Sequence, residues 1–289
     1  MHTSDVDVPT DEPHGPEGVD IGVQMRAGHV DIADGDDVVV EMVRRALAGR
    51  DEAAGPATIV DIGSGSGVLS ERLATEVPGH RIIANDTSRG SIRRAAARLG
   101  RYPLASVFDR SFLEWDQPAD VFISWGSHHH FPHSYLRQIA SLLSADGRLI
   151  IGDEFCPEYL EAGELASGRA WLIDGYLFTS EEEERAYRSA GTLPPSVARR
   201  EEARRRKLWA WYRFVVDQAV ARGDWTVAVL ELQIARDDLV TGFEDEHKTS
   251  PLLLETELAD AGFRIVDKRL IGDREPELQS FVVYEAAIA

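Results

Sequence analysis

Apolar runs and amphipathic segments alternate through the middle of the chain. Five short apolar runs, rich in β-branched residues and bounded by turn residues, predict buried strands. These runs are Ala57–Ile62, His80–Asn85, Ala105–Phe108, Val121–Trp125 and Leu149–Asp153. Helical patterns fit between them at Val68–Val77, Gly90–Leu99 and His133–Leu143. Strands that alternate with helices predict a parallel sheet covered on both faces.

The end of the chain departs from this alternation. A helix is expected at Pro251–Ala261, followed by strands at Phe263–Ile271 and Ser280–Ala286. Consecutive strands joined by a turn pair antiparallel. We therefore expect an otherwise parallel sheet that ends in an antiparallel hairpin, whereas a nicotinamide-binding domain would continue to alternate.

The turn after the first strand carries the strongest chemical signal. The run from Val60 to Gly67 reads Val-Asp-Ile-Gly-Ser-Gly-Ser-Gly, and its glycines allow a sharp turn and a close approach to a ligand. A pyrophosphate-binding turn would read G-x-G-x-x-G, which this spacing does not match. The acid Asp61 before the turn favours a cationic ligand over a pyrophosphate.

Acids also follow the next two strands. Asp86 ends the second strand, about twenty residues past the turn, where a carboxylate can accept both hydroxyls of a ribose. Asp109 follows the third strand. Each acid alone is more often a turn or cap residue, but three at the ends of successive strands indicate a nucleoside-containing ligand.

The glycine turn and the strand-end acids resemble the class I S-adenosylmethionine-dependent methyltransferases. The resemblance implies an α/β, Rossmann-like seven-stranded sheet with a C-terminal antiparallel hairpin, and S-adenosyl-L-methionine as cofactor. It places Asp109 against the adenine amine, and it makes the turn 144–147 a looser form of the family's L-x-P-G-G turn. The cofactor-binding residues it implies are Asp61, Gly63, Ser64, Gly65, Gly67, Asp86, Thr87, Asp109, Arg110 and Ser124.

A histidine-rich segment, His128-His129-His130-Phe131-Pro132-His133, follows the fourth strand. In the resembled family this segment passes beside the transferred methyl group, and His133 stands where an Asp is usual. A histidine here can take a proton, although helix capping and loop packing are equally open roles. The catalytic candidates are His130, His128 and Asp153.

We expect no metal, but a metal site is an open alternative. Two histidines and a carboxylate can form a facial iron site, here His128, His130 and Asp153, with His247 as a distant extra ligand. Asp153 and Glu154 alternatively orient the amino end of the cofactor or a substrate amine.

An insertion from Cys156 to Thr249 separates the fifth strand from the last helix. Its pattern is helical, and because it follows the C-terminal end of a strand we expect a cap over the substrate. Its aromatic residues include Trp171, Tyr176, Tyr187, Trp209, Trp211, Tyr212 and Trp225. Most are expected to form the insertion's core or a dimer interface. The charged run Arg199–Lys207 predicts a solvated helix face.

The organisation that follows has four parts. Residues 1–20 form a flexible acidic tail, 21–155 hold lid helices and the cofactor-binding core, 156–249 the helical substrate cap, and 250–289 complete the core. The expected substrate contacts are Trp125, His129, Glu154, Tyr159 and Tyr176.

The composition of the chain limits the classes of partner that it is expected to bind. With 31 basic and 50 acidic residues the net charge is −19, which disfavours nucleic acid and anionic membranes. No apolar run approaches the roughly 20 residues that span a bilayer, no signal peptide is apparent at the N-terminus, and the single Cys156 excludes a disulfide framework. We therefore expect a cytoplasmic protein with a small-molecule partner, with a homodimer left open.

The function that fits best is methyl transfer to a small, partly apolar organic molecule, in specialised metabolism. Two alternatives stay open: the same fold used for cyclase-like chemistry without methyl transfer, and a non-catalytic S-adenosylmethionine-binding module. The glycines and all three strand-end acids argue against the binding module. The sequence leaves the methylated atom undetermined.

Overall fold

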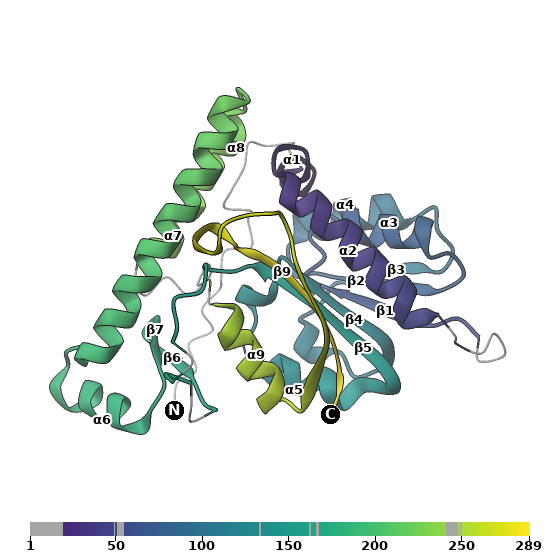
Figure 1. Cartoon of the computed structure of the whole chain (residues 1–289). Coiled ribbons are helices and arrows are strands. Elements are labelled where there is room, and N and C mark those ends of the chain that lie inside the picture. Colours follow the sequence, from purple (N-terminus) through teal and green to yellow (C-terminus); the bar gives the residue numbers. More distant parts are fainter. Residues whose placement is uncertain are drawn as a thin grey trace, which may run out of the picture.

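A seven-stranded sheet forms the centre of the molecule (Figure 1). The computed structural model describes residues 20–48, 50, 55–132, 134–161, 163–165, 168–240, 248 and 250–289. The sheet order is β3-β2-β1-β4-β5-β9-β8. The strands are β1 Thr58–Ile62, β2 Arg81–Asn85, β3 Ala105–Phe108, β4 Ala119–Trp125, β5 Leu143–Glu154, β8 Phe263–Leu270 and β9 Phe281–Ile288. The first five pair parallel, and β9 pairs antiparallel with both β5 and β8, which confirms the predicted fold.

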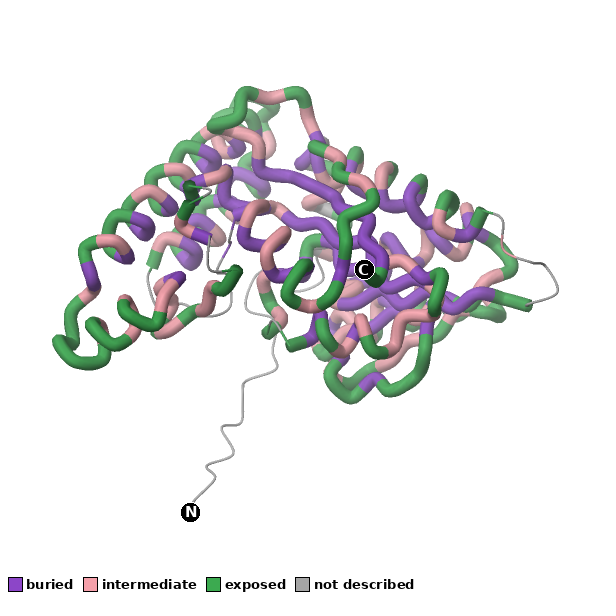
Figure 2. Tube along the Cα trace, turned by 60° about the horizontal axis from the view of Figure 1, so that its bottom comes forward, coloured by how far each residue is buried: buried purple, intermediate pink, exposed green. Residues whose placement is uncertain are grey.

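Alternate residues of each central strand point into two separate cores. In β1, Ile59 belongs to the core beneath α2 Val30–Leu47 and α3 Val68–Glu76, and Val60 to the core beneath α5 Ser134–Leu142 and α9 Pro251–Asp260. The remaining helices before β3 are α1 Ile21–Gly28 and α4 Arg89–Leu99. Strands buried on both faces are therefore continuous apolar runs, and Figure 2 shows them as the buried centre.

From β1 the chain first adds strands on one side of the sheet, β2 and β3, and then on the other, β4 and β5. The glycine turn follows β1, at the point where the direction changes. β1 is parallel to β2 on one side and to β4 on the other, with Ile62 opposite Asn85 and Ser124. Open α/β sheets bind ligands outside the carboxyl ends of their strands at such a reversal. The fold thus brings the glycine turn to the position where a ligand is expected.

The predicted turn at 144–147 is an irregularity within β5 in the structure. The ladder with β4 pairs Ala119 with Leu143 and then Val121 with Arg148, so the intervening residues of β5 are looped out. Gly147 fits here because a Cβ would lie 2.9 Å from the carbonyl oxygen of Asp120. Strand β5 therefore begins at Leu143, directly after the last residue of α5, and no loop lies between the two elements.

The insertion between β5 and α9 contains a two-stranded hairpin as well as helices. Its elements are β6 Trp171–Ile173, β7 Tyr176–Phe178, α6 Glu181–Ala190, α7 Pro195–Ala221 and α8 Trp225–Leu239. The hairpin was not predicted, although its Asp174-Gly175 turn, with both residues at positive φ, is a recognised hairpin signal. Helices α7 and α8 pack together along one side of the molecule (Figure 1).

The prediction of a solvated charged face on α7 is wrong for three residues. Arg200, Glu201 and Arg204 are buried, because they share a helix face with Leu208 and Trp211. Arg204 Nε donates to Glu201 Oε2 over 2.9 Å, so the buried charges are paired. Three short 3₁₀ helices complete the described fold: η2 Phe112–Glu114, η3 His128–His130 and η4 Pro276–Leu278.

Candidate functional site

The glycine turn is held closely against its neighbours. Gly63 and Gly67 have φ of 65° and 77°, values that favour glycine. A Cβ on Gly63 would lie 2.6 Å from that of Ser127, and one on Gly67 would lie 3.0 Å from that of Ala95. Gly65, by contrast, faces open space, with no atom within 4 Å of a Cβ built there. The turn therefore packs tightly at its two ends and is open in the middle.

Asp86 is bound directly to this turn. The backbone N–H of Gly65 donates to Asp86 Oδ2 over 2.8 Å, and that of Ser88 donates to Oδ1 over 2.8 Å. Burial raises the pKa of Asp86 while these hydrogen bonds oppose the increase. Each carboxylate oxygen keeps a further lone pair. The turn after β1 and the acid after β2 thus form one structural unit.

Asp61 lies buried beneath the turn. Its Oδ2 accepts a hydrogen bond of 2.5 Å from Ser70 Oγ. Burial, reinforced by the charges of Asp36 and Asp86 and opposed by the Ser70 hydrogen bond, raises its pKa to about 7. Three carboxylates around one glycine turn make this region suited to a cationic ligand.

The other predicted cofactor residues lie along the same edge. Asp109 and Arg110 are exposed after β3, and Asn85 Nδ2 holds their loop by donating to the carbonyls of Phe108 and Arg110, over 3.0 and 2.7 Å. Asn85 was not predicted. Thr87 is exposed beside Asp86.

Two serine hydroxyls fasten the end of β4 to the glycine turn. Ser124 Oγ lies 3.0 Å from Ser127 Oγ, and Ser127 Oγ donates to the carbonyl of Ile62 over 2.8 Å. Ser64 Oγ is buried and has no hydrogen-bond partner in the described part of the chain. A hydroxyl without a partner at this turn is a group that a bound ligand can satisfy.

The N-terminal helices are tied to the same edge by polar contacts that were not predicted. Trp125 Nε1 donates to Asp36 Oδ1 over 2.8 Å, and Arg26 donates to both oxygens of Asp36. Ser66 Oγ, in the glycine turn, donates to Asp20 Oδ1 over 2.8 Å at the start of α1. The expected lid helices thus lie against the turn.

The three histidines of η3 have different environments. His128 is buried, with Nδ1 2.8 Å from Tyr135 Oη and Nε2 3.4 Å from Glu257 Oε2. His129 Nδ1 lies 2.8 Å from Asp153 Oδ2, which also accepts from the His129 backbone N–H. His130 is exposed, with its ring 4.0 Å from that of His129. Asp153 therefore pairs with His129, whereas the sequence grouped it with His128 and His130.

His129 holds the Asp153 carboxyl in its ionised form. Burial alone would raise the pKa of Asp153, but the charge and hydrogen bonds of His129 lower it to about 2. Asp153 is thus a carboxylate that orients His129. Within the described residues, no three histidine, cysteine or acidic side chains are arranged to hold a metal. The candidates His133 and His247 lie outside the described residues.

The predicted substrate residues are only partly brought together. Glu154, at the end of β5, accepts a hydrogen bond from Trp211 Nε1 and lies 3.1 Å from Lys248 Nζ. Tyr159 is buried in the apolar core, and Tyr176 lies half-buried on β7. In the described chain no hydrogen bond joins either tyrosine to the histidines of η3.

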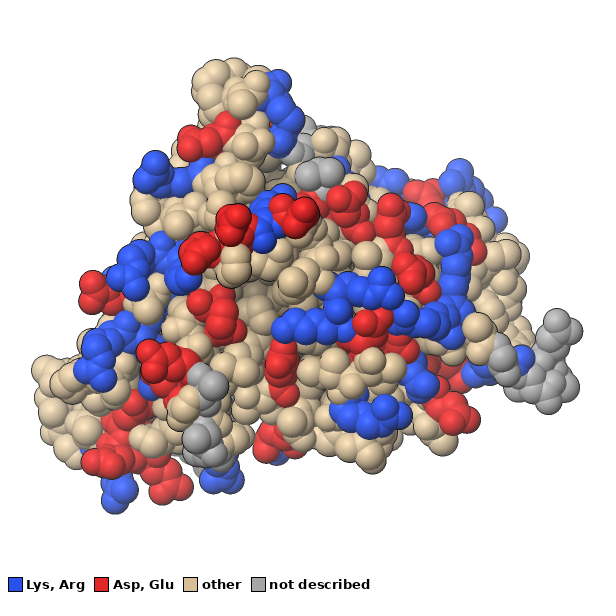
Figure 3. Space-filling model, in the orientation of Figure 1, with Lys and Arg blue, Asp and Glu red and all other residues tan. Residues whose placement is uncertain are grey.

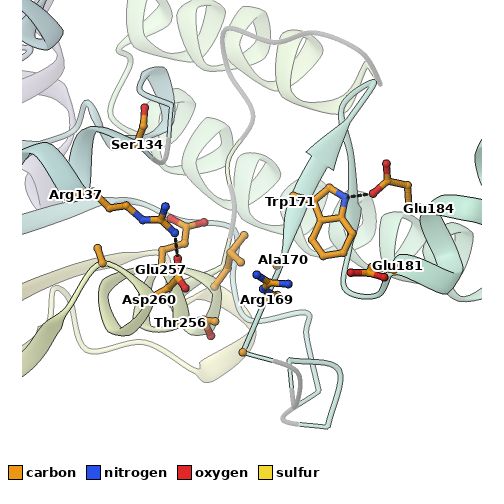
Figure 4. Close-up of a pocket in the computed structure, with 13 residues that line it drawn as sticks. Ser134, Arg137, Arg169, Ala170, Trp171, Glu181, Glu184, Thr256, Glu257 and Asp260 are labelled. Atoms are coloured by element: carbon orange, nitrogen blue, oxygen red, sulfur yellow. Dashed lines mark hydrogen bonds and ion pairs between the residues drawn. The ribbon is translucent and has the colours of Figure 1, made fainter.

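A cavity of about 540 Å³ opens between α5, α9 and the β6–β7 hairpin (Figure 4). Trp171 lines it, with its indole N–H donating to Glu184 over 3.0 Å. Glu257, from α9, lines the opposite wall and contacts His128. None of the residues predicted for the site lines this cavity, and Glu257 is the lining residue that contacts His128.

Comparison with known proteins identifies the domain. Residues 60–149, from the glycine turn into β5, match a family model described as a methyltransferase domain. No curated protein matches the chain.

Solved structures give weak overall similarity. A mitomycin 7-O-methyltransferase is 18% identical, with a TM-score of 0.48 over 91% of this chain, and this chain covers 55% of its length. Magnesium protoporphyrin IX methyltransferase from Synechocystis PCC 6803, solved with bound SAM, is 15% identical, with a TM-score of 0.47 over 95% of this chain and 87% of its own. A cyclopropane synthase from Mycobacterium tuberculosis is 14% identical, with a TM-score of 0.48 over 82% of this chain and 62% of its own.

The chain thus spans about half the length of the first of these proteins. The family model covers the segment that carries Asp61, Asp86 and Asp109, and the remainder of the sheet has the antiparallel end that the resemblance implies. Residues 60–149 therefore match a methyltransferase domain, and the described sheet has the fold that the resemblance implies.

Proposed function

We propose that this chain transfers a methyl group from S-adenosylmethionine to a small, partly apolar organic molecule at the C-terminal edge of β4 and β5. The observation that carries the proposal is the hydrogen bond from the Gly65 N–H to Asp86. It fixes a ribose-binding carboxylate beside an open glycine turn, with the buried acid Asp61 beneath.

The residues at the turn fit this cofactor. The space above Gly65, which a Cβ would enter, can admit the nucleoside, and the unsatisfied Ser64 hydroxyl offers a hydrogen bond. Asp86 retains acceptor capacity for the ribose hydroxyls. The carboxylate of Asp61 complements the positive charges of the methionine end.

The cofactor supplies a methyl group activated by a sulfonium, so the protein's principal task is orientation. Holding the acceptor atom about 3–3.5 Å from the methyl and in line with the leaving group is worth roughly 7–11 kcal/mol. Trp125 and the η3 segment occupy the edge where the acceptor would lie. His129, oriented by Asp153, is the residue placed to take the proton that a hydroxyl or ammonium acceptor loses.

Several features favour a small acceptor. On the face in Figure 3 the basic side chains are interleaved with acidic ones, and the net charge is −19, so a polyanion would be repelled. The described helices include none with the length and apolar character needed to cross a membrane. The aromatic insertion beside the site suits a partly apolar compound of specialised metabolism. The one cysteine, Cys156, is a free thiol, which fits a cytoplasmic enzyme.

Turnover products test the proposal. The protein is incubated with S-adenosylmethionine and a panel of hydroxylated and amino-substituted aromatic acceptors, and S-adenosylhomocysteine and acceptor mass are measured. The proposal predicts equal amounts of S-adenosylhomocysteine and of a product heavier by one methyl group, both abolished in Asp86→Ala. Conversion of an acceptor without S-adenosylhomocysteine would contradict methyl transfer and assign cyclase-like chemistry.

A further inference from the structure

Helix α8 carries buried carboxylates among the apolar side chains of its inner face. Glu231 is fully buried, on the face that it shares with Ala235, whereas Val229 and Leu232 are exposed. Charged side chains usually lie on the solvent face of such a helix. The contacts of the buried acids of α8 decide whether their burial is compensated.

Asp238, two turns further along the same face, is accounted for by its partners. It accepts hydrogen bonds from the Tyr212 hydroxyl and from the Lys248 backbone N–H, and it lies 3.1 Å from Lys248 Nζ. Lys248 Nζ also lies 3.1 Å from Glu154. This lysine is thus bound to two carboxylates other than Glu231.

Glu231 has no such partners. Across the residues that the structure describes, nothing donates a hydrogen bond to either of its carboxylate oxygens. The charged groups that act on it are Glu154, which repels it, and Lys248. A buried carboxylate without a donor is costly to a folded protein, and its presence points to a ligand that supplies the donors.

A second unsatisfied side chain lies in the same region, at the junction of α1 and α2. His29 is buried, and neither ring nitrogen is hydrogen-bonded to a described residue. The nearest carboxylate, Asp31, is 3.5 Å from Nδ1 and is itself bound by Arg274 over 2.6 Å. His29 and Glu231 are both within electrostatic reach of Glu154, and α1 contacts α8 (Figure 1).

Aromatic rings pack together beside His29 at the proposed reaction edge. The ring of Phe281, at the start of β9, lies 5.1 Å from that of His29, 6.0 Å from that of Trp125 and 6.0 Å from that of Trp211. These rings come from β4, β9, α7 and the α1–α2 junction, and they meet where β5 ends at Glu154. A planar apolar body packs well on such rings, and a cation beside them gains further attraction.

We propose that Glu231, His29 and this aromatic wall bind the methyl acceptor, and that the acceptor is a planar aromatic molecule bearing a protonated amine. The amine donates to Glu231 and to a ring nitrogen of His29, and its positive charge favours the ionised form of Glu231. An acceptor with a carboxylate in the same place would be repelled by Glu154 and would lack the proton donors that Glu231 needs. The inference rests on the proposed function, because it names the acceptor class of that site.

The test compares two probes of the same shape and opposite charge, tryptamine and indole-3-propionate. Calorimetry is performed on the full chain saturated with S-adenosylhomocysteine, for wild type and Glu231→Gln. Asp217→Asn is the matched control, because it removes an exposed carboxylate from the same helical hairpin. Wild type and the control should bind tryptamine at least tenfold more tightly than indole-3-propionate. Glu231→Gln should lose that preference while its affinity for S-adenosylhomocysteine is retained.

Each outcome separates this inference from the proposed function. Failure of wild type to bind S-adenosylhomocysteine contradicts the proposed function and removes the basis of this inference. With the cofactor product bound, equal binding of both probes, tighter binding of the acid, or no tryptamine binding at millimolar concentration overturns the acceptor class alone. A charge preference that survives in Glu231→Gln overturns the role of Glu231. Thermal melting establishes that each variant is folded.

Discussion

Trp125, at the end of β4, is hydrogen-bonded to Asp36 of α2 through its indole N–H, over 2.8 Å. The same buried carboxylate accepts from Arg26 Nε over 2.6 Å and from Nη2 over 3.1 Å. The neighbouring Gly35 leaves room for the indole, since a Cβ there would lie 2.2 Å from it. One carboxylate thus fastens both N-terminal helices to the edge of the sheet where we propose that the cofactor binds.

Asp36→Ala should lower the free energy of unfolding by about 3 kcal/mol, because it leaves the Trp125 N–H and the Arg26 guanidinium without their acceptor. Asp37→Ala is the control on the same helix: its carboxylate is largely exposed and pairs with Arg72. An exposed pair of this kind contributes about 0–1 kcal/mol. Urea unfolding measures both variants, and equal losses would contradict the fastening role of Asp36.

The two glycines Gly65 and Gly67 should respond differently to an added methyl group. Gly67→Ala should destabilise the fold by about 2 kcal/mol or more, because left-handed backbone strains alanine and the Cβ would meet Ala95. Gly65→Ala should cost about 1–2 kcal/mol of backbone strain only, since no atom of the protein opposes the Cβ. Its larger effect should be on affinity for S-adenosylhomocysteine. Denaturation and calorimetry on both variants test this contrast, which a parallel loss of affinity and stability would refute.

His129 and His130 are neighbours with different expected roles. His129→Ala should reduce kcat by about 10²-fold or more while S-adenosylhomocysteine affinity is kept, because it removes the base that Asp153 orients. His130→Ala, which alters an exposed ring, should have the smaller effect. Steady-state kinetics with an identified acceptor distinguishes them. A larger loss of kcat in His130→Ala would return the catalytic role to His130, as the sequence suggested.

Stability should depend on pH through Glu231. Burial, reinforced by the charge of Glu154 and opposed by that of Lys248, raises its pKa to about 8, whereas an unfolded glutamate titrates near 4.3. Between these values the folded state binds the extra proton, so stability falls as pH rises through this window and is constant above it. Glu231→Gln removes this dependence. Its advantage over wild type should grow from pH 5 to pH 8, by roughly 1.4 kcal/mol for each unit by which the pKa is raised.

Urea unfolding of wild type, Glu231→Gln and Asp217→Asn at pH 5, 6.5 and 8 measures this effect. Asp217 is exposed, so its variant should follow wild type across the series. A difference between Glu231→Gln and wild type that does not change with pH would show that Glu231 is ionised in the folded protein throughout.

The sheet was predictable because its signals are local. Strands buried on both faces read as apolar runs, and the glycine turn and the acids that follow the strands mark the carboxyl edge. Asp61 and Asp86 therefore lie where the sequence placed them. The same reasoning anticipated the antiparallel end of the sheet, since β8 and β9 are consecutive.

The sequence did not predict that charged side chains on three helices are buried. Asp36, Arg204 and Glu231 each occupy a position in the apolar stripe of their helix, but residue type alone assigns charged side chains to solvent. Helical periodicity would have placed all three inside. Their partners come from elements distant in sequence, which no local pattern reveals. The pairing of Asp153 with His129 was likewise inaccessible, because the turn of η3 decides which of three adjacent histidines faces β5.

Asp86 and the glycine turn are proposed to hold S-adenosylmethionine, and calorimetric titration with S-adenosylhomocysteine tests this role most directly. Wild type should bind at micromolar concentration, and Asp86→Ala about 100-fold more weakly, because two hydrogen bonds to a charged acceptor are lost. Asp116→Ala, which alters an exposed carboxylate, should bind as wild type does. Absence of binding by wild type, or an unchanged affinity in folded Asp86→Ala, would contradict the account.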